Sequence, residues 1–268
     1  MKIIAIANQK GGVGKTTTTI NLAAGLVKAG RRVLCIDLDP QSNLSTCLGY
    51  EPDAAPTISE LILAEAAPAM IQGAAPDLCE CIHHNAEGID YIPSNILLAS
   101  ADVFLAGAML RERTLDRVLT KASLTRYDYL LIDCLPSLGI LLTNALCAAD
   151  GVVIPVQAQK LSLDGLTQLL MVCNTAKQSL NPELQIYGIL PTMTDHTSMS
   201  QAVCDFLHTS YGDTTFAASI SRSVTAADSS NAQASLVSGA DRSGRGGRLG
   251  KEYLTFTQEF LQRCETEG

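Results

Sequence analysis

The sequence predicts an α/β fold in which helices cover both faces of a doubly wound, mostly parallel sheet. Short apolar runs alternate with longer segments of helical periodicity, which is the pattern of β-α units. The short runs are apolar on both faces, as strands between two layers of helices must be. The expected strands are Lys2–Ala7, Arg32–Ile36, Ile89–Ile92, Tyr129–Ile132, Gly151–Val156 and Gln185–Leu190. The expected helices are Lys15–Ala29, Thr57–Leu63, Arg113–Lys121, Leu138–Ala148, Leu163–Ser179, Ser198–Ser210 and Lys251–Arg263.

Length and composition favour one globular domain over residues 1–268, because 47% of the residues are hydrophobic and only 17% are charged. No apolar run approaches the roughly 20 residues that span a bilayer, and the N-terminus does not read as a signal peptide. We therefore expect a soluble, cytoplasmic protein whose nine irregularly spaced cysteines are free thiols. The net charge of −8 excludes attraction to nucleic acid by bulk charge, so any DNA contact must be a local patch.

Two segments fall outside this alternation. Residues 51–88, rich in Ala and Pro, are expected to form a peripheral insertion of short helices. Within them, Cys79-Glu80-Cys81-Ile82-His83-His84 leaves a zinc site open as an alternative. Residues 238–250 are rich in glycine, lack apolar periodicity and are expected to form a mobile basic loop. Its arginines are Arg242, Arg245 and Arg248.

The first strand runs directly into a glycine-rich loop and then into a helix, which is the order that a phosphate cradle needs. Glycines at positions 11, 12 and 14 allow backbone N–H groups to turn toward phosphate oxygens. Lys15 is placed to neutralise the β- and γ-phosphates, and the hydroxyl of Thr16 is placed to bind magnesium. The alternative is a glycine-rich turn without a ligand.

This loop resembles the deviant Walker A motif of the ParA/MinD family of P-loop ATPases, although Gln9 stands where the usual pattern has glycine. The resemblance implies ATP and Mg²⁺ as cofactors and a homodimer in the ATP state. It implies that Lys10 reaches the partner's nucleotide as a catalytic cation, and the alternative is a solvated surface lysine. The implied nucleotide contacts are Gly11, Gly12, Val13, Gly14, Lys15, Thr16 and Thr17.

Carboxylates follow two of the expected strands, where ligands bind in open parallel sheets. Asp37 and Asp39 follow the second strand, and Asp133 ends an apolar run of the Walker B type. The resemblance implies that Asp39 acts on the attacking water, and that Asp37 and Asp133 support the magnesium with Thr16. A turn or helix cap is the structural alternative for Asp37 and Asp39. Leu135 stands where the family has a proline, which affects the stiffness of the loop after Asp133.

Later motifs place the chain nearest to the short, Soj-like branch of ParA. Pro191 and Thr192 stand where the family reaches the adenine. His196 and Arg222 occupy the two positions that bind DNA in the family, and only Arg222 keeps a basic arginine. The three loop arginines could supply the missing positive charge, since non-specific DNA binding needs only phosphate contacts. Solvated side chains are the alternative for all four arginines.

The resemblance implies a nucleoid-associated, cytoplasmic ATPase for chromosome or plasmid partitioning. Its hydrolysis would be slow, magnesium-dependent and stimulated by a ParB/Spo0J-like partner, and its ATP dimer would bind duplex DNA non-specifically. One alternative is a MinD-like positioning ATPase, although the acidic residues at 264–268 do not suit a membrane-targeting helix. Another is a related reductase with an iron–sulfur cluster between subunits, for which only Cys134 is suitably placed.

Overall fold

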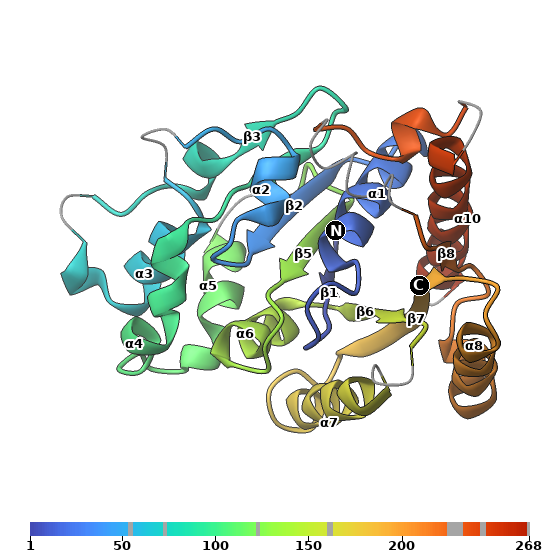
Figure 1. The fold of residues 1–268 in the computed structure, drawn as a ribbon. Coiled ribbons are helices and arrows are strands. Elements are labelled where there is room, and N and C mark those ends of the chain that lie inside the picture. The colour runs from blue at the N-terminus through green and yellow to red at the C-terminus, as the bar shows by residue number, and fades with distance from the viewer. Residues whose placement is uncertain are drawn as a thin grey trace.

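The computed structural model describes residues 1–52, 56–71, 74–121, 124–159, 163–223, 233–241 and 245–266. An eight-stranded sheet with the order β3-β4-β2-β5-β1-β6-β7-β8 forms its centre (Figure 1). All neighbouring strands are parallel except the edge pair β3 and β4. The strands are β1 (Lys2–Ile6), β2 (Val33–Leu38), β3 (His83–His84), β4 (Asp90–Ile92), β5 (Tyr129–Cys134), β6 (Gly151–Gln157), β7 (Gln185–Thr194) and β8 (Ile220–Ser221).

Helices cover both faces of this sheet (Figure 1). Buried residues of α3, α4, α5, α6, α7 and α8 form one core cluster with the sheet, and buried residues of α1, α2 and α10 form the other. The bounds are α1 (Lys15–Lys28), α2 (Asn43–Cys47), α3 (Ile58–Ala66), α4 (Ala101–Leu105), α5 (Thr114–Lys121), α6 (Ile140–Ala148), α7 (Leu163–Ser179), α8 (Ser198–Tyr211) and α10 (Arg245–Thr266).

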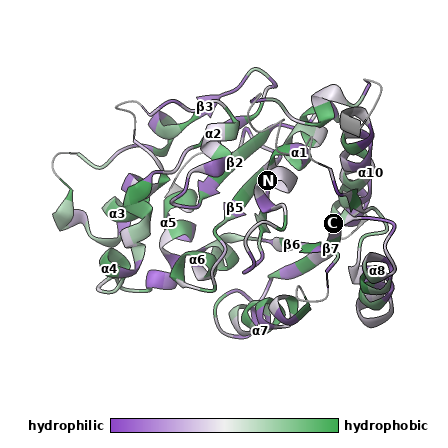
Figure 2. Cartoon of the chain, viewed as in Figure 1, coloured by the Kyte–Doolittle hydropathy of each residue, from purple (hydrophilic) through white to green (hydrophobic). Residues whose placement is uncertain are grey.

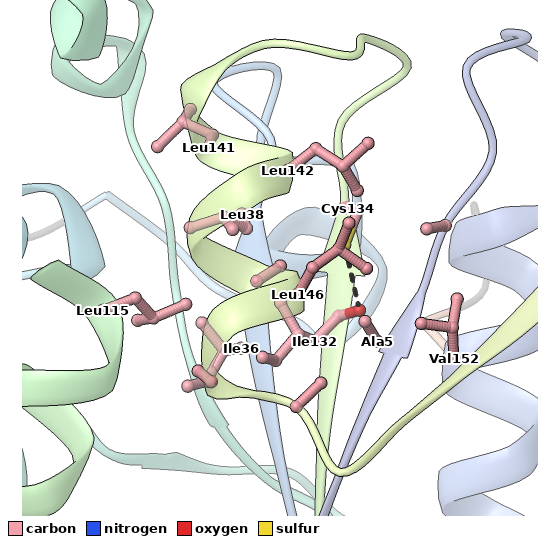
Figure 3. Close-up of a cluster of buried hydrophobic side chains, with 14 of the residues drawn as sticks. Ala5, Ile36, Leu38, Leu115, Ile132, Cys134, Leu141, Leu142, Leu146 and Val152 are labelled. Atoms are coloured by element: carbon pink, nitrogen blue, oxygen red, sulfur yellow. Dashed lines mark hydrogen bonds between the residues drawn. The ribbon is translucent and has the colours of Figure 1, made fainter. Parts of the chain in front are cut away.

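Alternation along the strands assigns each side chain to one of the two cores. In β1, Ile4 and Ile6 join the cluster under α1 and α10, whereas Ala5 joins the opposite cluster. In the same way Ile132 and Cys134 of β5 pack against α6 (Figure 3). The central strands are coloured mainly as hydrophobic residues (Figure 2), as expected for strands with two buried faces. A parallel sheet buried on both sides is the result, and it confirms the predicted fold class.

Most expected strands and helices are present, with shifted ends. Strands β2, β5 and β7 run further than expected, to Leu38, Cys134 and Thr194. Asp37 and Asp133 are therefore paired residues inside neighbouring strands, not loop residues that follow them. Short elements were not expected, among them β3, β8, α2 and α4, because two to five residues carry too little periodicity.

The expectation of a peripheral insertion at 51–88 was wrong for α3. Ile58 and Ile62 of this helix are almost fully buried in the core beside α5, so α3 belongs to the helical layer. Thr57 and Glu60 form a capping box that starts the helix. The zinc alternative gains no support, since in the part of the chain that the structure describes no three or more His, Cys, Asp or Glu residues lie where they could hold a metal ion together.

The expectation of a mobile loop at 238–250 was also wrong for the residues that can be described. Residues 237–239 form a short 3₁₀ helix, and 245–250 form the first turns of α10. The glycine at 250 allows close packing, because a Cβ there would lie 2.3 Å from the carbonyl oxygen of Leu236. Leu249 beside it is 2% exposed. Arg242 lies outside the described residues.

We predict that Gly250→Ala lowers the free energy of unfolding by about 1–3 kcal/mol, because backbone atoms of Leu236 and Ala240 occupy the space that the methyl group needs. Gly107→Ala is the matched control, since a Cβ at Gly107 meets nothing within 4 Å. Urea denaturation of both variants measures the difference. Equal stability of the two variants would contradict the close packing of α10 at this point.

Candidate nucleotide site

The loop between β1 and α1 is open above its glycines. A Cβ built on Gly11, Gly12 or Gly14 meets nothing within 4 Å, so there is free space beside the backbone of all three glycines. Gly12 and Gly14 have φ values of 73° and 91°, a left-handed conformation that favours glycine. Gly14 is the N-cap of α1 and provides no side-chain cap for the helix N–H groups. Those groups suit an anion such as a phosphate.

Lys15 and Asp133 are buried beneath this loop. The ammonium of Lys15 donates to the carbonyl oxygen of Lys10 at 3.2 Å, and burial lowers the pKa of Lys15 although Asp133 and Asp39 oppose the shift. Asp133 accepts hydrogen bonds from the hydroxyl groups of Thr16, at 2.7 Å, and Thr19, at 3.1 Å. Thr16 and Asp133 thus lie together, and their hydroxyl and carboxylate oxygens are suitable magnesium ligands.

The two other carboxylates are in different environments. Asp37 is fully buried in β2 next to Asp133, and burial raises its pKa to about 6 despite hydrogen bonds from Ser45 and the backbone of Asp39. Asp39 lies in the partly exposed turn after β2, where its carboxylate accepts from the N–H of Gln41 at 2.9 Å. Asp39 is therefore partly accessible to solvent, whereas Asp37 lies inside the sheet.

A cavity of about 270 Å³ lies beside the glycine loop and has a mainly apolar wall. Thr17 and Thr192 line it, and the Thr192 hydroxyl also donates to the carbonyl oxygen of Val13 at 2.8 Å, which joins β7 to the loop. Pro191 is buried inside β7 and is not among the lining residues. The remaining lining residues are Gly14, Met193, Ile220, Ser221, Arg222, Ser223, Leu236, Leu249 and Tyr253.

The candidate DNA-binding arginines have different environments in the structure. Arg222 is exposed and also lines the cavity. Arg248 pairs with Glu252 at 2.9 Å and donates to the hydroxyl of Ser221, so its charge is partly compensated within the chain. Glu252 also accepts from the N–H and hydroxyl of Ser221, both at 2.7 Å, and thereby joins α10 to β8. Arg245 begins α10.

Sequence reasoning missed several residues that build this site. Thr19 and Ser45 bind the buried carboxylates, and Glu252 holds the edge of the cavity. Thr19 stands one helical turn after Lys15, which is a signal that helix geometry could have revealed. Ser45 and Glu252 gave no such signal, because their partners are brought close only by the folded chain.

Comparisons with known proteins agree with this geometry. A family model described as an AAA domain matches residues 1–186. The sporulation initiation inhibitor protein Soj of Bacillus subtilis is 42% identical over 226 residues, which are 83% of this chain and 85% of that protein. The chromosome partitioning protein ParA of Caulobacter vibrioides is 39% identical over 84% of this chain and 82% of its own length. The chain belongs to the ParA/Soj family of P-loop ATPases.

Solved structures of proteins other than Soj and ParA have a similar fold. The ATP complex of a single-residue variant of McdA from Cyanothece has a TM-score of 0.83 at 26% identity, covering 98% of this chain and 96% of that one. Cobyrinic acid a,c-diamide synthase of Mycobacterium smegmatis, with bound ADP and magnesium, has a TM-score of 0.82 at 32% identity over 100% and 97% of the chains. In this ParA/Soj chain, none of the described helices is long and apolar enough to cross a membrane.

The buried carboxyl group of Asp133 generates a pH prediction. Burial, and then the nearby Asp37 carboxylate, raises its pKa to about 7 from the ordinary 3.8. The folded chain therefore binds this proton more tightly than the unfolded chain, so Asp133 lowers stability increasingly as pH rises from about 4 to about 7. Without magnesium, we expect the Tm of Asp133→Asn relative to the unmodified chain to rise over this interval.

Asp128→Asn is a control of opposite sign, because hydrogen bonds from Arg32 lower the pKa of Asp128. The Tm of Asp128→Asn relative to the unmodified chain should fall as pH rises through the acidic range. The unmodified chain gains stability as Asp128 ionises, and the asparagine variant does not. Thermal unfolding in the presence of a chelator measures both variants. A relative Tm of Asp133→Asn that does not change with pH would contradict the raised pKa.

Proposed function

We propose that this chain is a partition ATPase that binds ATP and Mg²⁺, dimerises in the ATP state and binds DNA non-specifically. The observation that carries the proposal is the meeting of the open glycine loop, Lys15, Asp39 and Asp133 at one edge of the sheet. Partitioning is proposed as the biological role because the chain is similar to Soj and to ParA over more than four fifths of its length.

The residues of the loop bind and orient the nucleotide in this proposal. Backbone N–H groups at 11–14 and the N-terminus of α1 surround the phosphates, and Lys15 neutralises the β- and γ-phosphate charge. Thr17 and Thr192 lie at the cavity that takes the nucleoside. Thr16 and Asp133 would hold Mg²⁺, which neutralises charge on the phosphates when bound, and Asp37 supports that group.

Asp39 orients the attacking water in the proposal, and Lys10 acts on the nucleotide of the partner subunit. Asp39 is the one of the three carboxylates in the partly exposed turn, so it alone can contact a water at the mouth of the site. A lysine supplied across a dimer would stabilise the charge of the transferring phosphoryl group, as an arginine finger does. Hydrolysis would then require two subunits, and a ParB/Spo0J-like partner would accelerate it.

The DNA surface in the proposal centres on Arg222. Its side chain is exposed and lines the nucleoside cavity, so nucleotide binding and DNA contact would share one wall. Arg242 and Arg245 would add positive charge, whereas Arg248 contributes less because Glu252 pairs with it. The net charge of −8 makes a monomer a poor DNA ligand, and dimerisation doubles the patch.

A MinD-like membrane role is the second candidate, and the packing of α10 argues against it. Tyr253, Phe256, Phe260 and Cys264 on the apolar face of this C-terminal helix are at most 2% exposed in the core under α1. The apolar face is therefore already covered and is not available for insertion into a lipid surface.

ATPase and binding assays on substituted chains test the catalytic part of the proposal. Lys15→Ala should abolish nucleotide binding, because its ammonium faces phosphate charge in the ground state. Asp39→Ala should bind ATP and lose about 10²–10⁴-fold in turnover, since it acts only on the water. Lys10→Ala should bind ATP as a monomer but lose ATP-dependent dimerisation, measured by light scattering. Normal turnover by Asp39→Ala would remove Asp39 from the catalytic role.

Measurements of DNA binding at increasing salt concentration test the DNA-binding part of the proposal. We expect ATP-dependent binding to duplex DNA that is independent of sequence and collapses as salt rises. Arg222→Ala should reduce the slope of log affinity against log salt by about 0.9 for each phosphate that the variant no longer neutralises. Arg32→Ala is the control, because it removes the same charge at the amino ends of the inner strands β2 and β5, where Arg32 pairs with Asp128. Binding to anionic vesicles with no DNA binding at low salt would favour the MinD-like role instead.

A further inference from the structure

Ser45 is fully buried between the ends of β2 and β4, and its side chain is hydrogen-bonded on both sides. The hydroxyl donates to Oδ2 of Asp37 at 2.6 Å and accepts from the N–H of Ser94 at 3.0 Å. The backbone N–H of Ser45 donates to the same Asp37 oxygen at 2.9 Å. The hydroxyl group of Ser45 therefore joins Asp37 of β2 to Ser94, two residues after the end of β4.

The sequence explains why a hydroxyl is needed at this point. The β2–β4 ladder ends at the pair Ile36 and Ile92, and Pro93 follows with no N–H to donate. The next N–H belongs to Ser94, which is 1% exposed and so cannot bind water. A buried N–H without an acceptor is costly, and Ser45 supplies the acceptor from α2.

The same group of hydrogen bonds holds the turn that carries Asp39. The second oxygen of Asp37 accepts from the N–H of Asp39 at 3.1 Å. Further along the turn, Ser42 has a left-handed φ of 54°, and its hydroxyl donates to the carbonyl oxygen of Ser94 at 2.9 Å. Both ends of the turn are thus attached to groups that Ser45 contacts.

We propose that Ser45 is a positioning residue for ATP hydrolysis, acting through Asp37 and the turn of residues 39–42 to fix Asp39. This inference rests on the proposed catalytic role of Asp39. Ser45 is not among the residues that line the cavity, so it should affect turnover and leave nucleotide binding unchanged. Ser94 takes part only through its backbone N–H and carbonyl groups, since its hydroxyl has no hydrogen-bond partner among the described residues.

Steady-state ATPase kinetics of Ser45→Ala test the proposal on the whole chain of 268 residues. This variant removes one hydrogen bond to Asp37 and leaves the Ser94 N–H without an acceptor, so the Asp39 turn loses its support. We expect kcat to fall about 10–100-fold, the size of effect that follows from a small misplacement of a catalytic group. The KM for ATP should stay within about twofold, because the residues that bind the nucleotide are intact.

Two serine variants separate positioning from general destabilisation. Ser59→Ala changes a fully buried serine whose hydroxyl has no partner among the described residues, and Ser94→Ala keeps the backbone donor. Both should retain nearly full kcat, even where their Tm falls as far as that of Ser45→Ala. An unchanged kcat in Ser45→Ala, or an equal loss in Ser59→Ala, would overturn the inference. Absence of turnover in the unmodified chain would instead overturn the proposed function, and the inference with it.

Discussion

The hydrogen bonds from Thr16 and Thr19 to Asp133 are the interaction on which the rest of the site depends. They join the first turn of α1 to the end of β5, although the residues lie more than a hundred positions apart in the chain. A buried carboxylate without such donors would be costly, so the loop, the helix and the strand must take up one arrangement together. The parallel register then brings Asp37 beside Asp133, and the turn after β2 follows.

The carboxylates of the site lie in or directly after two neighbouring strands of the sheet, and they differ in burial. Asp37 and Asp133 lie inside the sheet with raised pKa values, and Asp39 lies at the surface of the turn. Three residues of one chemical type thus lie in different environments, because burial and hydrogen bonding differ between them. Buried serine and threonine hydroxyls supply the hydrogen bonds that allow two acidic groups to sit side by side.

The sequence was sufficient for the fold class and for the residues of the glycine loop, because both depend on local order: strand, glycines, lysine and helix. It was insufficient for Ser45 and Glu252, whose partners Ser94 and Ser221 are far away in the chain. It was misleading at residues 245–250, where a glycine-rich run suggests a flexible loop but Gly250 allows a helix to pack closely. Arg248, expected as a free cation, is paired with Glu252 one helical turn away.

The cavity beside the glycine loop is built from both ends of the chain. Gly14 and Thr17 form one side, and Leu249 and Tyr253 of α10 form another. During synthesis the glycine loop leaves the ribosome long before α10 exists, so a nascent chain has the loop without this wall of the cavity. The cavity is therefore complete only when translation is nearly complete, and a chain that terminates before α10 lacks the wall.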